Sequence, residues 1–151
     1  MTVGKWIVLV LVTALAGCMS APGVQMAPPA ADDAAKQFAP PDGKANLYIA
    51  CNQGAGDRTV PVDITVDGKP AGTLIPGTYA LVVVDPGRHD IQASTRSGTA
   101  RLSLDAAAGK NLFYEVSLLT SGYVSRPDIG VVLIEQMGKL MVNQARLVQG
   151  P

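Results

Sequence analysis

Hydrophobic and polar side chains alternate along most of residues 44–148. In VPVDITVDG, residues 60–68, valine and isoleucine occupy every second position, with proline, aspartate and threonine between them. A period of two with one polar face is typical of a strand in an antiparallel sheet that has one side in water. ANLYIACN, residues 45–52, places leucine, isoleucine and cysteine on one face in the same way. Both segments are therefore predicted to be strands.

Turn residues separate further segments of this kind. Asp67-Gly68 and Asp85-Pro86-Gly87 are tight-turn signals, because glycine accepts a positive φ and proline presets its own φ. Residues 77–87 are apolar on both faces in their second half, which indicates a central strand. The remaining predicted strands are residues 69–74, 88–94, 99–106, 111–119 and 131–136. Many short strands predict an all-β fold, an antiparallel β-sandwich of about seven to nine strands.

The last part of the chain alternates less clearly. Residues 118–130, LLTSGYVSRPDIG, read as a long loop that Pro127 stiffens. In residues 138–149, GKLMVNQARLVQ, the apolar positions fit either a short helix or a last strand. We favour a short C-terminal helix that closes the sandwich.

The beginning of the chain has a different pattern. Lys5 is followed by an apolar run over residues 6–15 and then by Ala16-Gly17-Cys18. The run is shorter than the roughly 20 residues that span a bilayer, but it suits a signal-peptide core. LAGC, residues 15–18, resembles the bacterial lipobox. This resemblance implies that residues 1–17 are a lipoprotein signal peptide and that Cys18 is acylated.

Acyl chains on Cys18 would hold the mature protein on a membrane, since each buried methylene contributes roughly 0.8 kcal/mol. In the enterobacterial type of sorting, Met19 at the next position implies the outer membrane, with the protein facing the periplasm. The alternatives are an ordinary signal with an incidental cysteine, or an apolar helix of a soluble fold.

Residues 19–43 are rich in alanine and proline and poor in large apolar side chains. Such a composition favours a disordered spacer, because little surface can be buried. We predict that Cys18 and this spacer form a tether over residues 18–43, with the β-sandwich domain in residues 44–151. An extended tether would span up to about 80 Å and would hold the domain clear of the lipid headgroups.

Charge and cysteine content exclude several classes of protein. Removal of a signal that contains Lys5 leaves 11 basic against 12 acidic side chains, a net charge near −1. This balance argues against nucleic-acid binding, which needs a basic surface. With Cys18 acylated, Cys51 is the one remaining thiol, so no disulfide can form within the chain.

Three longer segments resemble a known family: GKANLYIAC, ITVDGKPAGTLIPGTYALVVVDPGRHDIQA and LSLDAAAGKNLFYEVSL. Together they are similar to small bacterial lipoproteins whose domain has no established function. They are also similar to the wider set of transthyretin-like and carboxypeptidase-regulatory-like β-sandwiches. The resemblance covers most of residues 44–135, implies a β-sandwich in the cell envelope, and carries no catalytic residues.

Few side chains in the sequence suggest a chemical role. His89 is the one histidine and reads as a structural or surface residue, since a zinc site needs several ligands. Asp57, Asp63 and Asp67 could touch a calcium ion, although solvated strand carboxylates are the commoner case. Cys51 is interpreted as a buried apolar residue, with a disulfide to another chain as the alternative. We expect no catalytic site, no metal and no cofactor.

The segment with a binding character is the predicted loop 118–130. Tyr123, Arg126 and Asp128 could form an exposed recognition tip, since binding residues favour loops on rigid scaffolds. The alternative is an ordinary connection.

These features favour a membrane-anchored interaction module for another envelope protein or a glycan. The alternatives are a structural or stress-related envelope lipoprotein without a specific ligand and an enzyme that acts on glycan. The enzyme is the least favoured of these hypotheses, because a carboxylate pair would have to come from few residues: Glu115 and Glu135 are the only glutamates.

Overall fold

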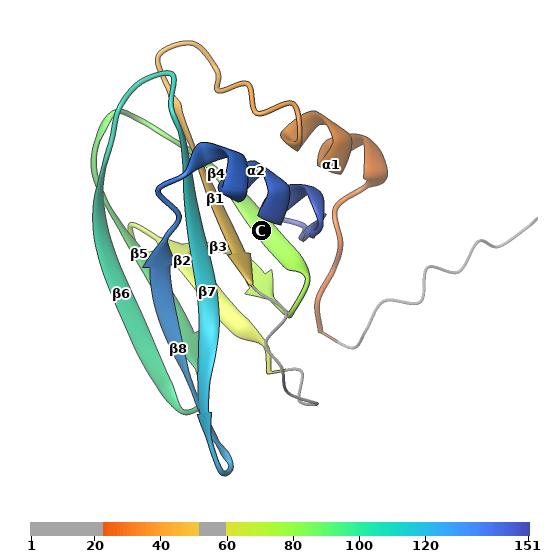
Figure 1. The fold of residues 1–151 in the computed structure, drawn as a ribbon, viewed down its shortest axis with the longest axis vertical. Coiled ribbons are helices and arrows are strands. Elements are labelled where there is room, and N and C mark those ends of the chain that lie inside the picture. The colour runs from red at the N-terminus through yellow and green to blue at the C-terminus, as the bar shows by residue number, and fades with distance from the viewer. Residues whose placement is uncertain (1–22, 52–59) are drawn as a thin grey trace, which may run out of the picture.

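Nine strands in the described part of the chain form two sheets that face each other, with two helices outside them (Figure 1). The structure is a computed structural model and describes residues 23–51 and 60–151. The elements are α1 (Pro29–Ala35), β1 (Ala45–Cys51), β2 (Val62–Val66), β3 (Lys69–Leu74), β4 (Thr78–Val84), β5 (Gly87–Thr95), β6 (Gly98–Ala106), β7 (Asn111–Ser121), β8 (Val124–Val131), α2 (Glu135–Asn143) and β9 (Arg146–Leu147).

The larger sheet has the strand order β8-β7-β1-β4-β9, and the smaller sheet has the order β3-β2-β5-β6. This confirms the predicted all-β sandwich with a short helix near the C-terminus. Most neighbouring strands are antiparallel, but β1 pairs with β7 and β4 pairs with β9 in parallel. These two pairs join strands far apart in the sequence, so no hairpin turn fixes their relative direction.

The core between the sheets follows the predicted alternation in β2. Val62, Ile64 and Val66 are buried, whereas Asp63 between them is exposed. Burial of one such aliphatic side chain contributes about 1.5–3 kcal/mol. The period of two predicted for this strand is confirmed.

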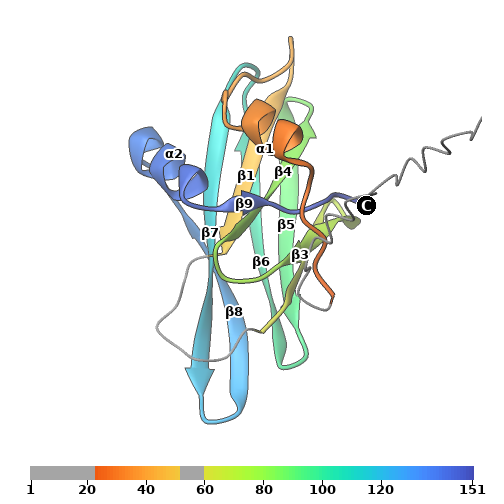
Figure 2. The same cartoon turned by 90° about the vertical axis from the view of Figure 1, so that its right-hand side faces the viewer.

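β1 differs from β2 because it is buried on both faces. Leu47 and Ile49 lie in the core between the sheets, while Tyr48 and Ala50 face outward into a second apolar cluster. Figure 2 shows α1 and α2 over this outer face of the larger sheet, and Val142 of α2 belongs to the second cluster. The sandwich therefore has a third, helical layer on one side.

The prediction of a flexible tether over residues 19–43 is wrong from Val24 onward. Val24 is buried in the core between the sheets, and the Ala27 N–H donates to the Leu147 carbonyl oxygen at 2.9 Å. Further along, Phe38 packs on the second cluster. The alanine- and proline-rich composition is misleading here, because a few apolar side chains anchor the whole segment. The folded unit therefore includes most of the predicted tether.

Asp32 of α1 ties this segment to the end of the chain. Its Oδ1 accepts hydrogen bonds from the Tyr79 hydroxyl at 2.8 Å and the Leu147 N–H at 3.0 Å. Its Oδ2 accepts from Lys36 Nζ at 2.8 Å, and the same ammonium group donates to the Ala145 carbonyl at 2.8 Å. Burial alone would raise the pKa of Asp32, but these hydrogen bonds outweigh it and lower that pKa.

Residues 118–130 are not a long loop. β7 continues to Ser121, β8 begins at Val124, and Gly122-Tyr123 is the turn between them. Pro127 lies inside β8, which is an edge strand of the larger sheet. An edge strand tolerates proline, since the missing N–H is not needed on its open side.

The predicted strand over residues 131–136 is wrong after Val131. The chain leaves the sheet there, and α2 begins at Glu135. For the tail at residues 138–149, the favoured helix is present as far as Asn143. The alternative also holds in part, because β9 forms a short strand beside β4.

We expect Asp32→Ala to lower the free energy of unfolding of the domain by about 1–3 kcal/mol, because it leaves the Tyr79 hydroxyl and the Leu147 N–H without their acceptor. Asp33→Ala, at an exposed position of the same helix, is the matched control, with an expected change below about 0.5 kcal/mol. Urea denaturation near pH 7 measures both. Equal and small effects would mean that the hydrogen bonds of Asp32 do not stabilise the domain.

Candidate functional site

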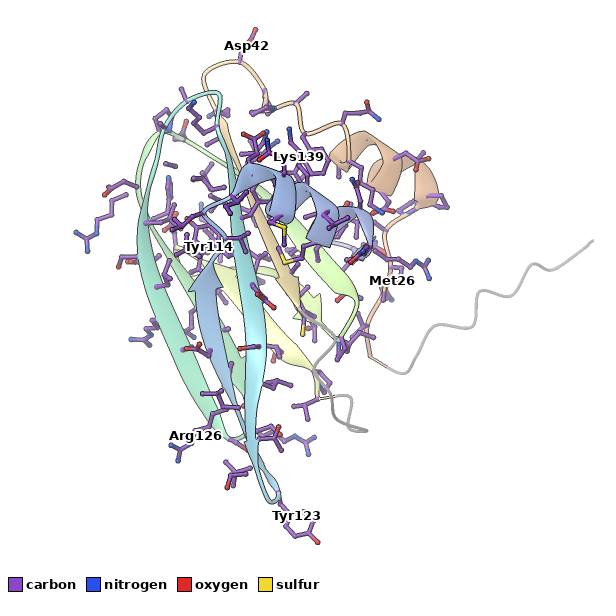
Figure 3. The ribbon with its side chains drawn as sticks, in the orientation of Figure 1. Met26, Asp42, Tyr114, Tyr123, Arg126 and Lys139 are labelled. Atoms are coloured by element: carbon purple, nitrogen blue, oxygen red, sulfur yellow. The ribbon has the colours of Figure 1, made fainter. Side chains whose placement is uncertain are left out.

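The three residues predicted to form a recognition tip lie on one hairpin but do not converge on one point. Tyr123 is 88% exposed in the turn between β7 and β8. Arg126 and Asp128 are exposed positions of β8 and alternate with buried ones. Figure 3 shows Tyr123 at the extreme tip and Arg126 further along the hairpin. Arg126 also lines a shallow hollow with Leu118 and other residues near the turn.

The predicted acylation site, Cys18, lies outside the described residues. No helix in the described part of the chain is long and apolar enough to cross a membrane. Attachment through a lipid therefore stays a prediction from the LAGC motif.

His89 has structural contacts at a junction of two turns. Its Nδ1 lies 2.6 Å from Asp67 Oδ2, and its Nε2 lies 2.7 Å from the Asp85 carbonyl oxygen. Both neighbours are acceptors, so the imidazolium form satisfies both, whereas neutral imidazole has only one N–H. The hydrogen bond to Asp67 raises the pKa of His89, and partial burial opposes this only in part. His89 thus links the β2–β3 turn to the β4–β5 turn, which lie at the same end of the β2–β5 pair.

The carboxylates considered for calcium have other partners. Asp63 accepts a hydrogen bond from the Thr73 hydroxyl at 2.7 Å, and Asp67 is engaged by His89. The third, Asp57, lies outside the described residues. Within residues 23–51 and 60–151, no three side chains of His, Cys, Asp or Glu are grouped so that they could hold a metal ion.

Cys51 is buried at the end of β1, next to the core between the sheets. Burial, and secondly the nearby Glu115 carboxylate, raise the pKa of its thiol to about 11. The thiol is therefore protonated at neutral pH, and a protonated thiol is a poor nucleophile.

The surface that the sequence reasoning missed is an apolar ridge at the start of α2. Its four members, each at least half exposed, are Leu133, Ile134, Met137 and Leu140. Leu133 alone is 90% exposed. The others recur every three residues, a spacing that places them on one side of a helix and that could have been read from the sequence. The ridge was missed because residues 131–136, VVLIEQ, are predicted to be a strand.

The opposite side of α2 packs on the larger sheet at Gly138. A Cβ atom at this position would lie 2.2 Å from Cγ of Phe113, so the helix can approach the sheet this closely only with glycine there. On the helix surface, Lys139 pairs with Glu135 at 2.7 Å and lies 5.4 Å from the centre of the Phe38 ring. Gly138 and Lys139 therefore fix the position of the ridge relative to the sheet.

Comparison with protein families and with curated proteins adds no relatives. The sequence matches no protein-family model, and no curated protein is similar to it. The ridge and the β7–β8 hairpin therefore have to be interpreted from their own geometry.

Gly138→Ala tests the position of the ridge. In an exposed helix, this change stabilises by about 1 kcal/mol. Here we expect a loss of about 1–3 kcal/mol in the free energy of unfolding, because the new methyl group overlaps Phe113. Gly130→Ala is the control, since the nearest atom to its Cβ is the Glu115 carbonyl oxygen at 3.9 Å. A stabilised Gly138→Ala variant in urea denaturation would show that α2 does not lie against Phe113.

His89→Gln tests the link between the turns through its pH dependence. Because folding raises the pKa of His89, its contribution to stability is complete below the ordinary value of 6.5 and is lost as the pH rises through the raised value. The pKa of Asp67 is lowered, so the contribution of its carboxylate to stability is lost only in acid. The difference in unfolding free energy between the native protein and His89→Gln should be largest near about pH 6 and shrink towards about pH 9. A difference that is constant across this range would contradict the ion pair.

Proposed function

We propose that this protein is a lipid-anchored lipoprotein of the bacterial envelope and that its β-sandwich is a non-catalytic interaction module. The LAGC motif at residues 15–18 supports the anchor on Cys18, and Met19 supports the outer membrane, facing the periplasm. The resemblance of the later segments to small envelope lipoproteins points in the same direction.

The observation that carries the interaction role is the apolar ridge on α2. Isolated exposed hydrophobic residues are ordinary, but a group of adjacent large ones on one helix and the residues just before it marks a contact surface. Methionine suits such a surface, because its flexible thioether adapts to a partner. Leu133 and Ile134 add aliphatic area beside it.

The chemistry of the ridge favours a protein partner over a glycan. Aliphatic and thioether side chains gain free energy by leaving water, as they do at the centre of protein interfaces. A glycan presents many hydroxyl groups that need hydrogen-bonding partners, and the four ridge side chains offer none. The ridge is therefore proposed to be the centre of a protein–protein contact.

Photo-crosslinking in living cells tests this role. A photoreactive amino acid in place of Leu133 should form one discrete adduct, because the ridge meets one partner. The same amino acid in place of Asp105, an exposed residue of β6 on the other sheet, is the matched control and should not form it. Met137→Asp, which puts a charge on the ridge, should lower the adduct yield at position 133 several-fold.

The role of the anchor is tested in the same assay with Cys18→Ser, which blocks acylation but not export. Loss of the adduct in this variant would show that placement at the membrane matters. Scattered adducts at both positions would instead favour a structural lipoprotein without a specific ligand. Hydrolytic turnover by the purified protein would contradict the non-catalytic role.

A further inference from the structure

The chain between the proposed anchor and the folded domain is short. Val24 is only 4% exposed and lies in the core between the sheets. Six residues, from Cys18 to Gly23, precede it, and they can reach at most about 20 Å whatever path they take. A free tether as far as residue 43 would have reached about 80 Å. With Cys18 acylated, the domain is therefore held against the bilayer.

We propose that the tip of the β7–β8 hairpin docks on the lipid surface of that membrane. This inference rests on the proposed acylation of Cys18 and adds a second, non-covalent contact with the same bilayer. The described chain begins beside the lower half of the sandwich in Figure 1, and the hairpin projects from that same half. A reach of about 20 Å thus lets the anchor and the tip meet one surface.

The tip presents apolar side chains to solvent. Leu119 and Val124 are 64% and 43% exposed on either side of the turn, with the Tyr123 ring beyond them. Tyrosine is enriched at membrane interfaces, where its ring enters the apolar region and its hydroxyl stays among the headgroups. A hairpin tip with this composition fits the boundary between headgroups and acyl chains.

A second hairpin supports the first at the same end. The Thr95 hydroxyl, at the β5–β6 turn, donates to the Ser125 carbonyl oxygen at 2.9 Å. A Cβ atom on Gly98 would lie 3.4 Å from Cγ of Arg126, so the arginine stem rests against the same turn. Arg96 follows Thr95 directly. Arg96 and Arg126 therefore belong to one end of the molecule, although their hairpins belong to different sheets.

The charged side chains nearest the two hairpin turns are basic. The two hairpin segments, residues 91–104 and 116–127, contain Arg96, Arg101 and Arg126 and no carboxylate, although the whole chain is electrically neutral. Carboxylates occur further from the turns, at Asp90 and Asp105 beside the first segment and at Glu115 and Asp128 beside the second. Each arginine near an anionic bilayer is worth about 1 kcal/mol. Charge and apolar character therefore both complement an anionic lipid surface.

A lipid surface suits this tip better than a protein does. Three apolar side chains form the centre of a contact far smaller than the roughly 800 Å² per partner that a stable protein interface buries. A tip on an anchored protein needs little affinity of its own, because the acyl chains keep it at a high local concentration. The ridge is remote from the tip, since Figure 3 places Lys139 of α2 in the opposite half of the molecule from Tyr123.

The sequence offers a fluorescence test, because Trp6 is its single tryptophan and lies in the proposed signal peptide. Tyr123→Trp then gives a mature protein with one tryptophan, at the tip. The acylated variant, purified from membranes, is reconstituted into vesicles of phosphatidylcholine and phosphatidylglycerol with brominated acyl chains. We expect its emission to shift to shorter wavelength and to lose more than half of its intensity. Leu133→Trp, on the ridge, is the matched control and should keep its intensity.

Combining Tyr123→Trp with Arg96→Gln and Arg126→Gln should restore most of the emission, because the electrostatic attraction is reduced. Unquenched emission from position 123, or equal quenching at positions 123 and 133, would overturn the docking of the tip. The intact mass of the purified protein separates this failure from that of the proposed function. A mass without acyl chains on Cys18 would refute the anchor and with it this inference. An acylated protein with an unquenched tip would refute the docking alone.

Discussion

The outer face of β1 has to be covered, and the rest of the structure depends on this. Tyr48 is completely buried there, with its ring centre 5.2 Å from those of Phe38 and Phe113. Its hydroxyl donates to the Ala35 carbonyl oxygen at 2.6 Å, and burial raises its pKa to about 12. A buried hydroxyl without an acceptor would cost about 1–3 kcal/mol. The central strand is therefore satisfied only when the segment that precedes it folds back over the sheet.

The segment that covers β1 is held in turn by the end of the chain. Asp32 accepts from the Leu147 N–H, 115 residues away, and Lys36 donates to the Ala145 carbonyl, 109 residues away. Neither contact exists until both ends of the described chain have reached the sheet. The outer layer thus forms from segments that are remote in sequence but adjacent in space, and each supplies polar partners that the other needs.

The difference between local patterns and contacts that are remote in sequence explains what could be predicted from the sequence. The alternation of Ile64 with Asp63 is local, so it predicted β2 and the sandwich. Whether Tyr48, on the outer face of β1, is exposed or buried depends on residues remote in sequence, such as Val142. The local sequence pattern around Tyr48 therefore cannot predict its burial. Glycine usually disfavours a helix, but Gly138 lies inside α2, where it permits a close approach to Phe113. Of the candidate site, Tyr123 and Arg126 were found by residue type, although Pro127 suggested a loop in place of an edge strand. The spacing of the α2 ridge was readable, but residues 131–136 are predicted to be a strand, and the exposure of the ridge follows from tertiary packing.

With Cys18 acylated, as proposed, the residues that complete the sandwich also set its distance from the membrane. A domain on a tether of about 80 Å could turn the α2 ridge in any direction. A domain held within about 20 Å, with a second contact at the hairpin tip, has far less freedom, and the ridge is kept on the side away from the lipid. The stability of the outer layer and the reach of the tether are coupled. Local unfolding of the segment that contains Val24 and Asp32 would both uncover Tyr48 and lengthen the tether. The stability of this outer layer therefore governs how far from the bilayer the ridge can meet a partner.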